Sequence, residues 1–156
     1  MRSDPGVLAE LDVVVASVHS KLRQPASELT PRLLKAIADP NMDILGHCTG
    51  RIVTGRGRPQ STFDAAAVFA ACAEHGVAVE INSRPERLDP PDDLLAIAIE
   101  AGCRFSIDSD AHTPGQLAWQ DNGAEIAARN SLSADRIIDT LSADDLLALV
   151  NQRYSS

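Results

Sequence analysis

Short apolar runs alternate with amphipathic segments along this chain of 156 residues. Four runs rich in Val, Ile, Leu and Ala, at 13–18, 42–46, 77–82 and 103–108, have the length and composition of buried strands. The segments between them place apolar residues at helical spacing. The pattern therefore predicts strands that alternate with helices.

Capping residues predict where the first helices begin and end. Thr30 followed by Pro31 is typical of a helix start, with Thr30 as the N-cap and Pro31 at the first helical position. Either Ser61 or Thr62 is expected to cap the next helix, which Gly76 is expected to end.

Two further helices are expected over 91–101 and after Ser142. Strands that alternate with helices of this length form right-handed βα units around a parallel sheet. We therefore expect an α/β fold in which residues 1–156 form a single domain.

Composition and charge exclude several classes of protein. With 44% hydrophobic and 23% charged residues, the chain has the composition of a globular protein and not of a disordered or fibrous one. Its net charge of −8 leaves no broad basic surface, so we expect no nucleic-acid binding by this chain alone. No apolar run approaches the ~18 residues of a membrane helix, and the polar N-terminus does not resemble a signal peptide.

Cysteine usage points to a reducing environment. The three cysteines, Cys48, Cys72 and Cys103, are far apart and odd in number, which does not suggest a disulfide framework. A cytoplasmic location is therefore expected.

Each expected strand is followed at its carboxyl end by residues that can bind or react: His19, then His47, then Asn82, and finally Asp110 with His112. Because parallel strands all point the same way, these residues are expected to meet at one rim of the sheet. Enzymes built from βα units keep their active sites at this rim.

Imidazole and carboxylate groups together suit Zn, Mn or Fe. Asp110 and His112 are two residues apart, so they face the same side of an extended segment. A single histidine after a strand is more often a hydrogen-bonded core residue, but three that converge favour a metal site. His75 lies in the last turn of an expected helix and is interpreted as structural or solvated.

A second group of candidates is formed by the arginines of the loops that follow two strand ends. They are Arg51, Arg56, Arg58, Arg84 and Arg87. Guanidinium groups at a rim suit a phosphate, and Arg51 and Arg84 are nearest the strand ends. The alternative is that these arginines are solvated and pair with nearby acidic residues.

Four stretches resemble, in order and spacing, the motifs of the polymerase and histidinol phosphatase (PHP) family. They are VVVASVHS at 13–20, DILGHCTGR at 43–51, VEINSRPERLD at 79–89 and SIDSDAH at 106–112. The resemblance is to the PHP domains of bacterial family X DNA polymerases and to their free-standing relatives. In the second motif Cys48 stands where the family has proline.

The resemblance implies a distorted, TIM-like (βα)7 barrel with up to three divalent metal ions at its rim. Zn or Mn is expected, and Fe is a further candidate. It implies that His19 and His47 share one metal ion. It implies that Asp110 and His112 are ligands of the others and take part in catalysis.

The chain also departs from the family pattern. The family opens with a His-x-His signature on its first strand, and nothing before Asp12 matches it. We therefore expect a partial barrel made of the later four βα units, with fewer metal ions than the complete site. Open strand edges would favour a homo-oligomer that covers them.

The function predicted by resemblance is that of a metal-dependent phosphoesterase. Its substrate would be a small phosphomonoester or a phosphate at a nucleotide or DNA end, contacted by Arg51, Arg84 and Asn82. The alternative is a catalytically incompetent regulatory or scaffolding fragment of a larger protein similar to a DNA polymerase.

Overall fold

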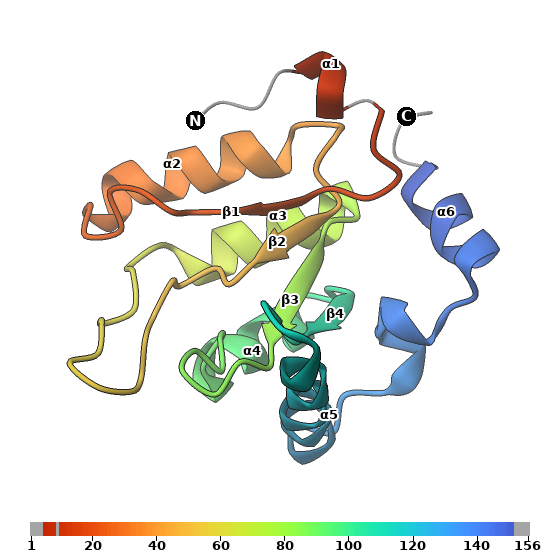
Figure 1. Cartoon of the computed structure of the whole chain (residues 1–156). Helices are drawn as coiled ribbons and strands as arrows, with labels where there is room; N and C mark the ends of the chain where they lie inside the picture. The colour runs from red at the N-terminus through yellow and green to blue at the C-terminus, as the bar shows by residue number, and fades with distance from the viewer. Residues whose placement is uncertain (1–4, 9, 152–156) are drawn as a thin grey trace.

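The computed structural model describes residues 5–8 and 10–151. Four strands form one parallel sheet in the order β1-β2-β3-β4 (Figure 1). The strands are β1 (Val15–Ser17), β2 (Ile44–Gly46), β3 (Ala78–Asn82) and β4 (Phe105–Asp108). The α-helices are α1 (Pro5–Leu8), α2 (Ala26–Ile37), α3 (Ala65–His75), α4 (Asp92–Glu100), α5 (Gln120–Arg129) and α6 (Ala143–Asn151). Three short 3₁₀ helices are η1 (Pro114–Trp119), η2 (Ala134–Arg136) and η3 (Ile138–Thr140).

The alternation of strands with helices confirms the α/β prediction. Among the described residues β1 and β4 have no further named strand beside them, and only an isolated parallel bridge joins Phe105 to Ile137 beyond β4. Closure of the sheet into a barrel stays a prediction. No helix in the described part of the chain has the length and apolar character needed to cross a membrane.

The two faces of the sheet differ in polarity. One face packs against α2, α3 and α4, where Leu33, Phe69, Val79 and Leu95 are among the buried residues of the main hydrophobic cluster. On the other face Glu80 pairs with Ser106 across β3 and β4, and both residues are buried. A buried polar row requires hydrogen-bond partners, and on the same face Ile44, Ala78 and Ile138 form a second, smaller hydrophobic cluster.

The first strand was expected to be buried over 13–18, and this is wrong. Strand β1 has only three residues, and the Val15 residue is 50% exposed. The reason is topological, because β1 lies at the edge of the described sheet and Val15 has no neighbouring strand on that side.

The start of α2 was also wrong. The helix begins at Ala26 after Pro25, and Pro31 lies inside it on an exposed position. The carbonyl oxygen of Pro25 accepts the Leu29 N–H at 3.0 Å, and the Leu29 side chain is fully buried. Burial of Leu29 with Leu33 on the same stripe therefore extends the helix ahead of Pro31, although Pro31 cannot donate a hydrogen bond.

The cap of α3 is Asp64 and not Ser61 or Thr62. An Oδ1 oxygen of Asp64 accepts the Ala67 N–H at 3.0 Å, whereas the Ser61 hydroxyl donates to the Leu22 carbonyl at 2.8 Å. The loop before α3 thus uses Ser61 to tie itself to the segment after β1.

Other boundaries are confirmed. Gly76 ends α3 with a left-handed φ of 67°, as its place after the last helical turn predicted. The Ser142 hydroxyl accepts the Asp145 N–H at 3.1 Å at the start of α6. The three cysteines, Cys48, Cys72 and Cys103, are buried and unbridged.

Candidate functional site

The predicted rim residues lie at the carboxyl ends of the four strands. His19 lies just beyond β1 and His47 directly follows β2, and their ring centroids are 5.0 Å apart in an edge-to-face arrangement. Two histidines that are 28 positions apart in the sequence are therefore neighbours in space, because β1 and β2 are adjacent parallel strands.

The backbone around His47 is unusual and closely held. His47 has a positive φ of 23°, and its N–H donates to Oε2 of the Glu80 carboxylate. A Cβ atom on Gly46 would lie 2.9 Å from Val15 Cγ1 and would also collide with the Ser17 hydroxyl. Gly46 is therefore required where β1 and β2 come together, and it sets the direction in which His47 leaves the strand.

The His47 side chain is desolvated and carries no charge at neutral pH. Burial, and after it the nearby positive charge of Arg87, lower its pKa from 6.5 to about 4. Its Nδ1 atom is buried and has no hydrogen-bond partner among the described residues. A neutral imidazole with an unused nitrogen is ready to bind a metal ion.

Glu80 is a functional candidate that the sequence analysis missed. Besides the His47 N–H, its Oε2 accepts Asn82 Nδ2 at 3.4 Å, and the residue is only 6% exposed. Burial and the neighbouring Asp108 carboxylate raise the pKa of Glu80 to about 7, although the two hydrogen bonds oppose this shift. The available signal was a glutamate inside an otherwise apolar strand.

Asn82 lies at the rim but is fully buried. Its Oδ1 accepts the Arg84 N–H at 3.2 Å, and its amide nitrogen donates to Glu80. In the structure Asn82 therefore connects the end of β3 to the following loop.

Asp110 belongs to a group of charged residues at the end of β4. It has a left-handed φ of 50°, and its Oδ2 accepts Arg87 Nε at 3.1 Å and lies 3.8 Å from Arg84 Nη1. Its charge also acts on His47, where it raises the pKa against the larger effects of burial and Arg87. Asp110 thus lies within electrostatic reach of the histidine pair.

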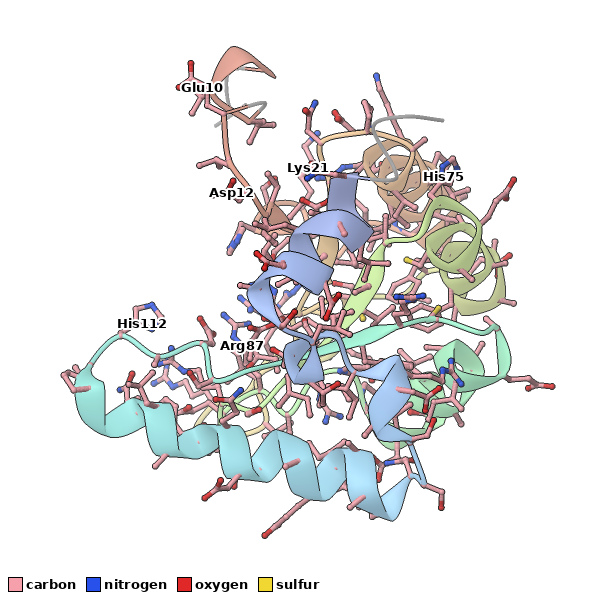
Figure 2. The ribbon with its side chains drawn as sticks, turned by 90° about the vertical axis from the view of Figure 1, so that its right-hand side faces the viewer. Glu10, Asp12, Lys21, His75, Arg87 and His112 are labelled. Atoms are coloured by element: carbon pink, nitrogen blue, oxygen red, sulfur yellow. The ribbon has the colours of Figure 1, made fainter. Side chains whose placement is uncertain are left out.

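His112 is exposed and turned to its own loop. Its Nδ1 lies 2.8 Å from the Asp110 carbonyl oxygen and 3.2 Å from Arg84 Nη1, and its N–H donates to Gln116 Oε1 at 2.7 Å. Figure 2 shows the His112 ring at the outside of the molecule, whereas Arg87 lies closer to the sheet. His112 therefore lies beside Arg84 and the Asp110 backbone, whereas the histidine pair is formed by His19 and His47.

The predicted substrate arginines have different surroundings. Arg51 directs Nε and Nη2 at the carbonyl oxygens of Arg87 and Leu88. Arg84 pairs with Glu86 at 3.1 Å, and its guanidinium lies 5.6 Å from the Trp119 ring centre. Only Arg84 of these two faces the Asp110 and His112 side of the rim.

The residues fit part of a metal site. The buried, unpartnered Nδ1 of His47 beside His19, with the Asp110 carboxylate nearby, suits a divalent ion that accepts imidazole and carboxylate ligands. Within the described ranges, however, no group of three or more His, Cys, Asp or Glu residues is arranged to hold a metal ion. The described chain therefore supplies a ligand pair and nearby candidates, and not a closed ligand shell.

These features define an α/β protein with imidazole, carboxylate and guanidinium groups at the carboxyl ends of parallel strands. No protein-family model matches the chain. Among curated proteins it is similar to the DNA polymerase/3'-5' exonuclease PolX of Bacillus subtilis, with 31% identity over 149 residues. That alignment covers 96% of this chain and 26% of PolX.

The chain is also similar to proteins named as probable phosphatases. One from Aliivibrio fischeri strain ES114 is 33% identical, and one from Vibrio parahaemolyticus is 31% identical. Both alignments cover 83% of this chain and 53% of the relative, so the chain spans about half the length of these phosphatases. The relatives support a distant kinship with probable phosphatases and with a DNA polymerase/3'-5' exonuclease.

Proposed function

We propose that this chain carries a metal-dependent phosphoesterase site of the PHP type. The observation that carries the proposal is the pair of His19 and His47, whose ring centres are 5.0 Å apart. The His47 imidazole is buried and neutral, and its Nδ1 atom has no hydrogen-bond partner among the described residues. Similarity to probable phosphatases over most of the chain supports the same reaction class.

The roles of the residues follow from their surroundings. His19 and His47 would hold one divalent ion, Zn or Mn, and Asp110 would supply a carboxylate ligand and act in catalysis. His112 would join them after its ring turns away from the Asp110 carbonyl. The chemistry that such an ion supplies is activation of water for attack on phosphorus and neutralisation of phosphoryl charge.

The other groups act on the substrate and on the shape of the site. Arg84 would neutralise charge on a phosphoryl oxygen, as a guanidinium does through paired N–H donors. Glu80 would hold the His47 backbone in its left-handed conformation through the hydrogen bond described above. Asn82 would keep the loop that carries Arg84 against the end of β3.

The test is hydrolysis and metal binding by the purified chain. We expect p-nitrophenyl phosphate or a 3′-phosphorylated oligonucleotide to be hydrolysed with Mn²⁺ or Zn²⁺, with loss of activity in chelator and recovery on metal addition. A chain that binds metal ions but hydrolyses neither substrate would contradict the proposal for this chain.

A second candidate is a catalytically incompetent domain. It is favoured by the absence of a three-residue ligand group among the described residues. Metal analysis separates the two, because a stoichiometry near zero ions per chain favours this candidate.

We also propose that the exposed edge at β1 pairs with another copy of the chain. Val15 is 50% exposed there, and an uncovered strand edge favours pairing. Light scattering during size-exclusion chromatography would report a dimer, and a monomer would contradict this proposal.

A further inference from the structure

The arginines of the rim differ in how many of their N–H donors are already used. Arg51 directs Nε at the Arg87 carbonyl oxygen, 2.9 Å away, and Nη2 at that of Leu88. A guanidinium has five N–H donors in one rigid plane. Because two of them point at successive carbonyl oxygens, this side of the Arg51 guanidinium faces the loop backbone. The loop backbone therefore uses two of the Arg51 nitrogen atoms, Nε and Nη2.

Arg84 is also largely occupied. Its Nε donates to Glu86, its Nη1 lies near His112 Nδ1 and the Asp110 carbonyl oxygen, and its guanidinium lies over the Trp119 ring. Arg84 could contact a phosphate, but the phosphate would compete with the Glu86 carboxylate and the Trp119 ring for its guanidinium.

Arg87 has unused donors. Its Nε donates to Asp110 Oδ2 at 3.1 Å, while its Nη1 is buried and has no partner among the described residues. The Arg87 side chain as a whole keeps an 18% exposed fraction. A buried donor without an acceptor is unfavourable, and an anion at this position would supply the acceptor.

Arg87 is also placed beside the proposed metal ligands. It contacts Asp110 directly, and its charge acts on His47 across the rim. A phosphoryl group must lie next to the metal ligands in order to be hydrolysed, and the Arg87 side chain contacts the Asp110 carboxylate at hydrogen-bond distance.

We propose that Arg87 binds the phosphate of the substrate and that Arg51 is a positioning residue that holds Arg87 in place. This inference rests on the proposed phosphoesterase function and assigns the anion-binding group within it. It replaces Arg51 as the expected phosphate contact and leaves Arg84 as a second contact.

The backbone explains why a positioning residue is needed. The N–H groups of Arg87 and Leu88 both donate to the Arg84 carbonyl oxygen, at 2.8 Å and 3.0 Å, in a tight turn. Leu88 has a left-handed φ of 44°, which a leucine adopts only when its surroundings hold it there. Arg51 donates hydrogen bonds to the Arg87 and Leu88 carbonyl oxygens of this turn and so sets the direction of the Arg87 side chain.

Inorganic phosphate is the probe for the test. Its affinity for the chain is measured by isothermal titration calorimetry, with saturating Mn²⁺ and again without metal. We expect Arg87→Met to weaken phosphate binding about tenfold or more, because a charge-assisted hydrogen bond contributes this much. Arg104→Met is the matched control, since Arg104 is an exposed arginine directly before β4, at the end of the sheet away from the rim, and it should stay within about twofold of the wild-type chain.

Arg51→Met separates positioning from direct contact. We expect it to weaken phosphate binding and also to speed amide hydrogen exchange over residues 84–90, whereas Arg87→Met should leave that exchange unchanged. Arg51→Met with weaker phosphate binding and unchanged exchange would make Arg51 the direct contact and overturn the assignment. Arg87→Lys keeps the positive charge but loses the planar guanidinium, and it replaces Arg87→Met if that variant does not fold. Unchanged phosphate affinity in either Arg87 variant also overturns the assignment of Arg87.

The outcome for Arg87 is independent of the outcome for the metal site. If the wild-type chain binds phosphate but no Mn²⁺ or Zn²⁺, the phosphoesterase proposal fails while the titration without metal still decides the role of Arg87. If the wild-type chain binds phosphate in neither condition, the Arg87 assignment is overturned.

Discussion

The two sides of the rim, at the ends of β1 and β2 and at the ends of β3 and β4, differ in the charge of their side chains. At the ends of β1 and β2, His19 and His47 lie together, and burial keeps His47 neutral with an unused nitrogen. At the ends of β3 and β4, Arg84, Arg87 and Asp110 are charged and compensate one another. The first side is suited to receive a cation, and the second presents guanidinium groups to an anion while a carboxylate orients them.

This difference bears on the proposed binding of a phosphate by an acidic chain. The net charge of −8 opposes anion binding over the whole surface. Local arrangement prevails at the rim, because Arg84 and Arg87 converge on one carboxylate and retain N–H donors beyond it.

The largest effect is expected from removing the imidazole side. His47→Gln should weaken Mn²⁺ or Zn²⁺ binding by about 100-fold or more, since even outer-shell partners of a ligand contribute about 10–100-fold. Isothermal titration calorimetry measures this. His75→Gln is the control, because His75 lies in the last turn of α3, and equal losses in both variants would contradict a site at His47.

The next effect concerns pH and the buried Glu80. Its folded pKa is raised from 4.5 to about 7, so the stability that it contributes is complete below pH 4.5 and is lost as pH rises through 7. This amounts to about 3 kcal/mol as an upper value, at 1.36 kcal/mol per unit. Relative to the wild-type chain, Glu80→Gln should therefore gain stability between pH 4.5 and 7, as measured by urea unfolding without metal.

His47 provides the opposite slope as a control. Its folded pKa is lowered from 6.5 to about 4, so the stability linked to it is present above pH 6.5 and is lost as pH falls through 4. His47→Gln should therefore gain relative stability as pH falls. Parallel curves for the wild-type chain and both variants would show that neither residue is buried as described.

A smaller effect is expected from the junction of β1 and β2. Gly46→Ala would place a methyl group against Val15 and Ser17, and we expect a loss of about 1–3 kcal/mol, as overpacking usually causes. Gly115→Ala is the control, because nothing lies within 4 Å of its Cβ position and its φ is not left-handed, and it should change stability by no more than about 0.5 kcal/mol. Equal urea midpoints for the two variants would contradict the close approach at Gly46.

The smallest effect is expected on the arginine side. Glu86→Gln removes the carboxylate that pairs with Arg84. The side chains of Glu86 and Arg84 are 41% and 27% exposed, so the free energy of unfolding should change by less than about 1 kcal/mol. Phosphate affinity should rise by up to about threefold because Arg84 loses a competing partner. A fall in phosphate affinity would mean that Glu86 orients Arg84 for binding.

Much of the fold could be predicted from the order of apolar and polar residues. The ends of β3 and β4 at Asn82 and Asp108 match the predicted ones, because each strand ends where a buried run meets a polar loop. The start of α2 could not be predicted from its caps, because burial of Leu29 outweighs the local preference of Thr30 and Pro31.

The candidate site also has features that the sequence could predict and features that it could not. That His19 and His47 are neighbours follows from parallel strands of one sheet, so it was predictable. Glu80 was missed because its importance depends on the His47 N–H, which is remote in sequence. Arg51 was preferred over Arg87 because it is nearer a strand end, but proximity along the chain does not determine where a long side chain points.

The sequence by itself determined the alternation of strands and helices and the gathering of histidine, asparagine and aspartate residues at one end of the sheet. Both follow from periodicity and from the common direction of parallel strands. Only the tertiary structure decided that His47 is buried and neutral, that Arg51 holds a loop and that Arg87 keeps unused donors. These properties depend on burial and on hydrogen bonds between residues far apart in the sequence, which no local pattern records.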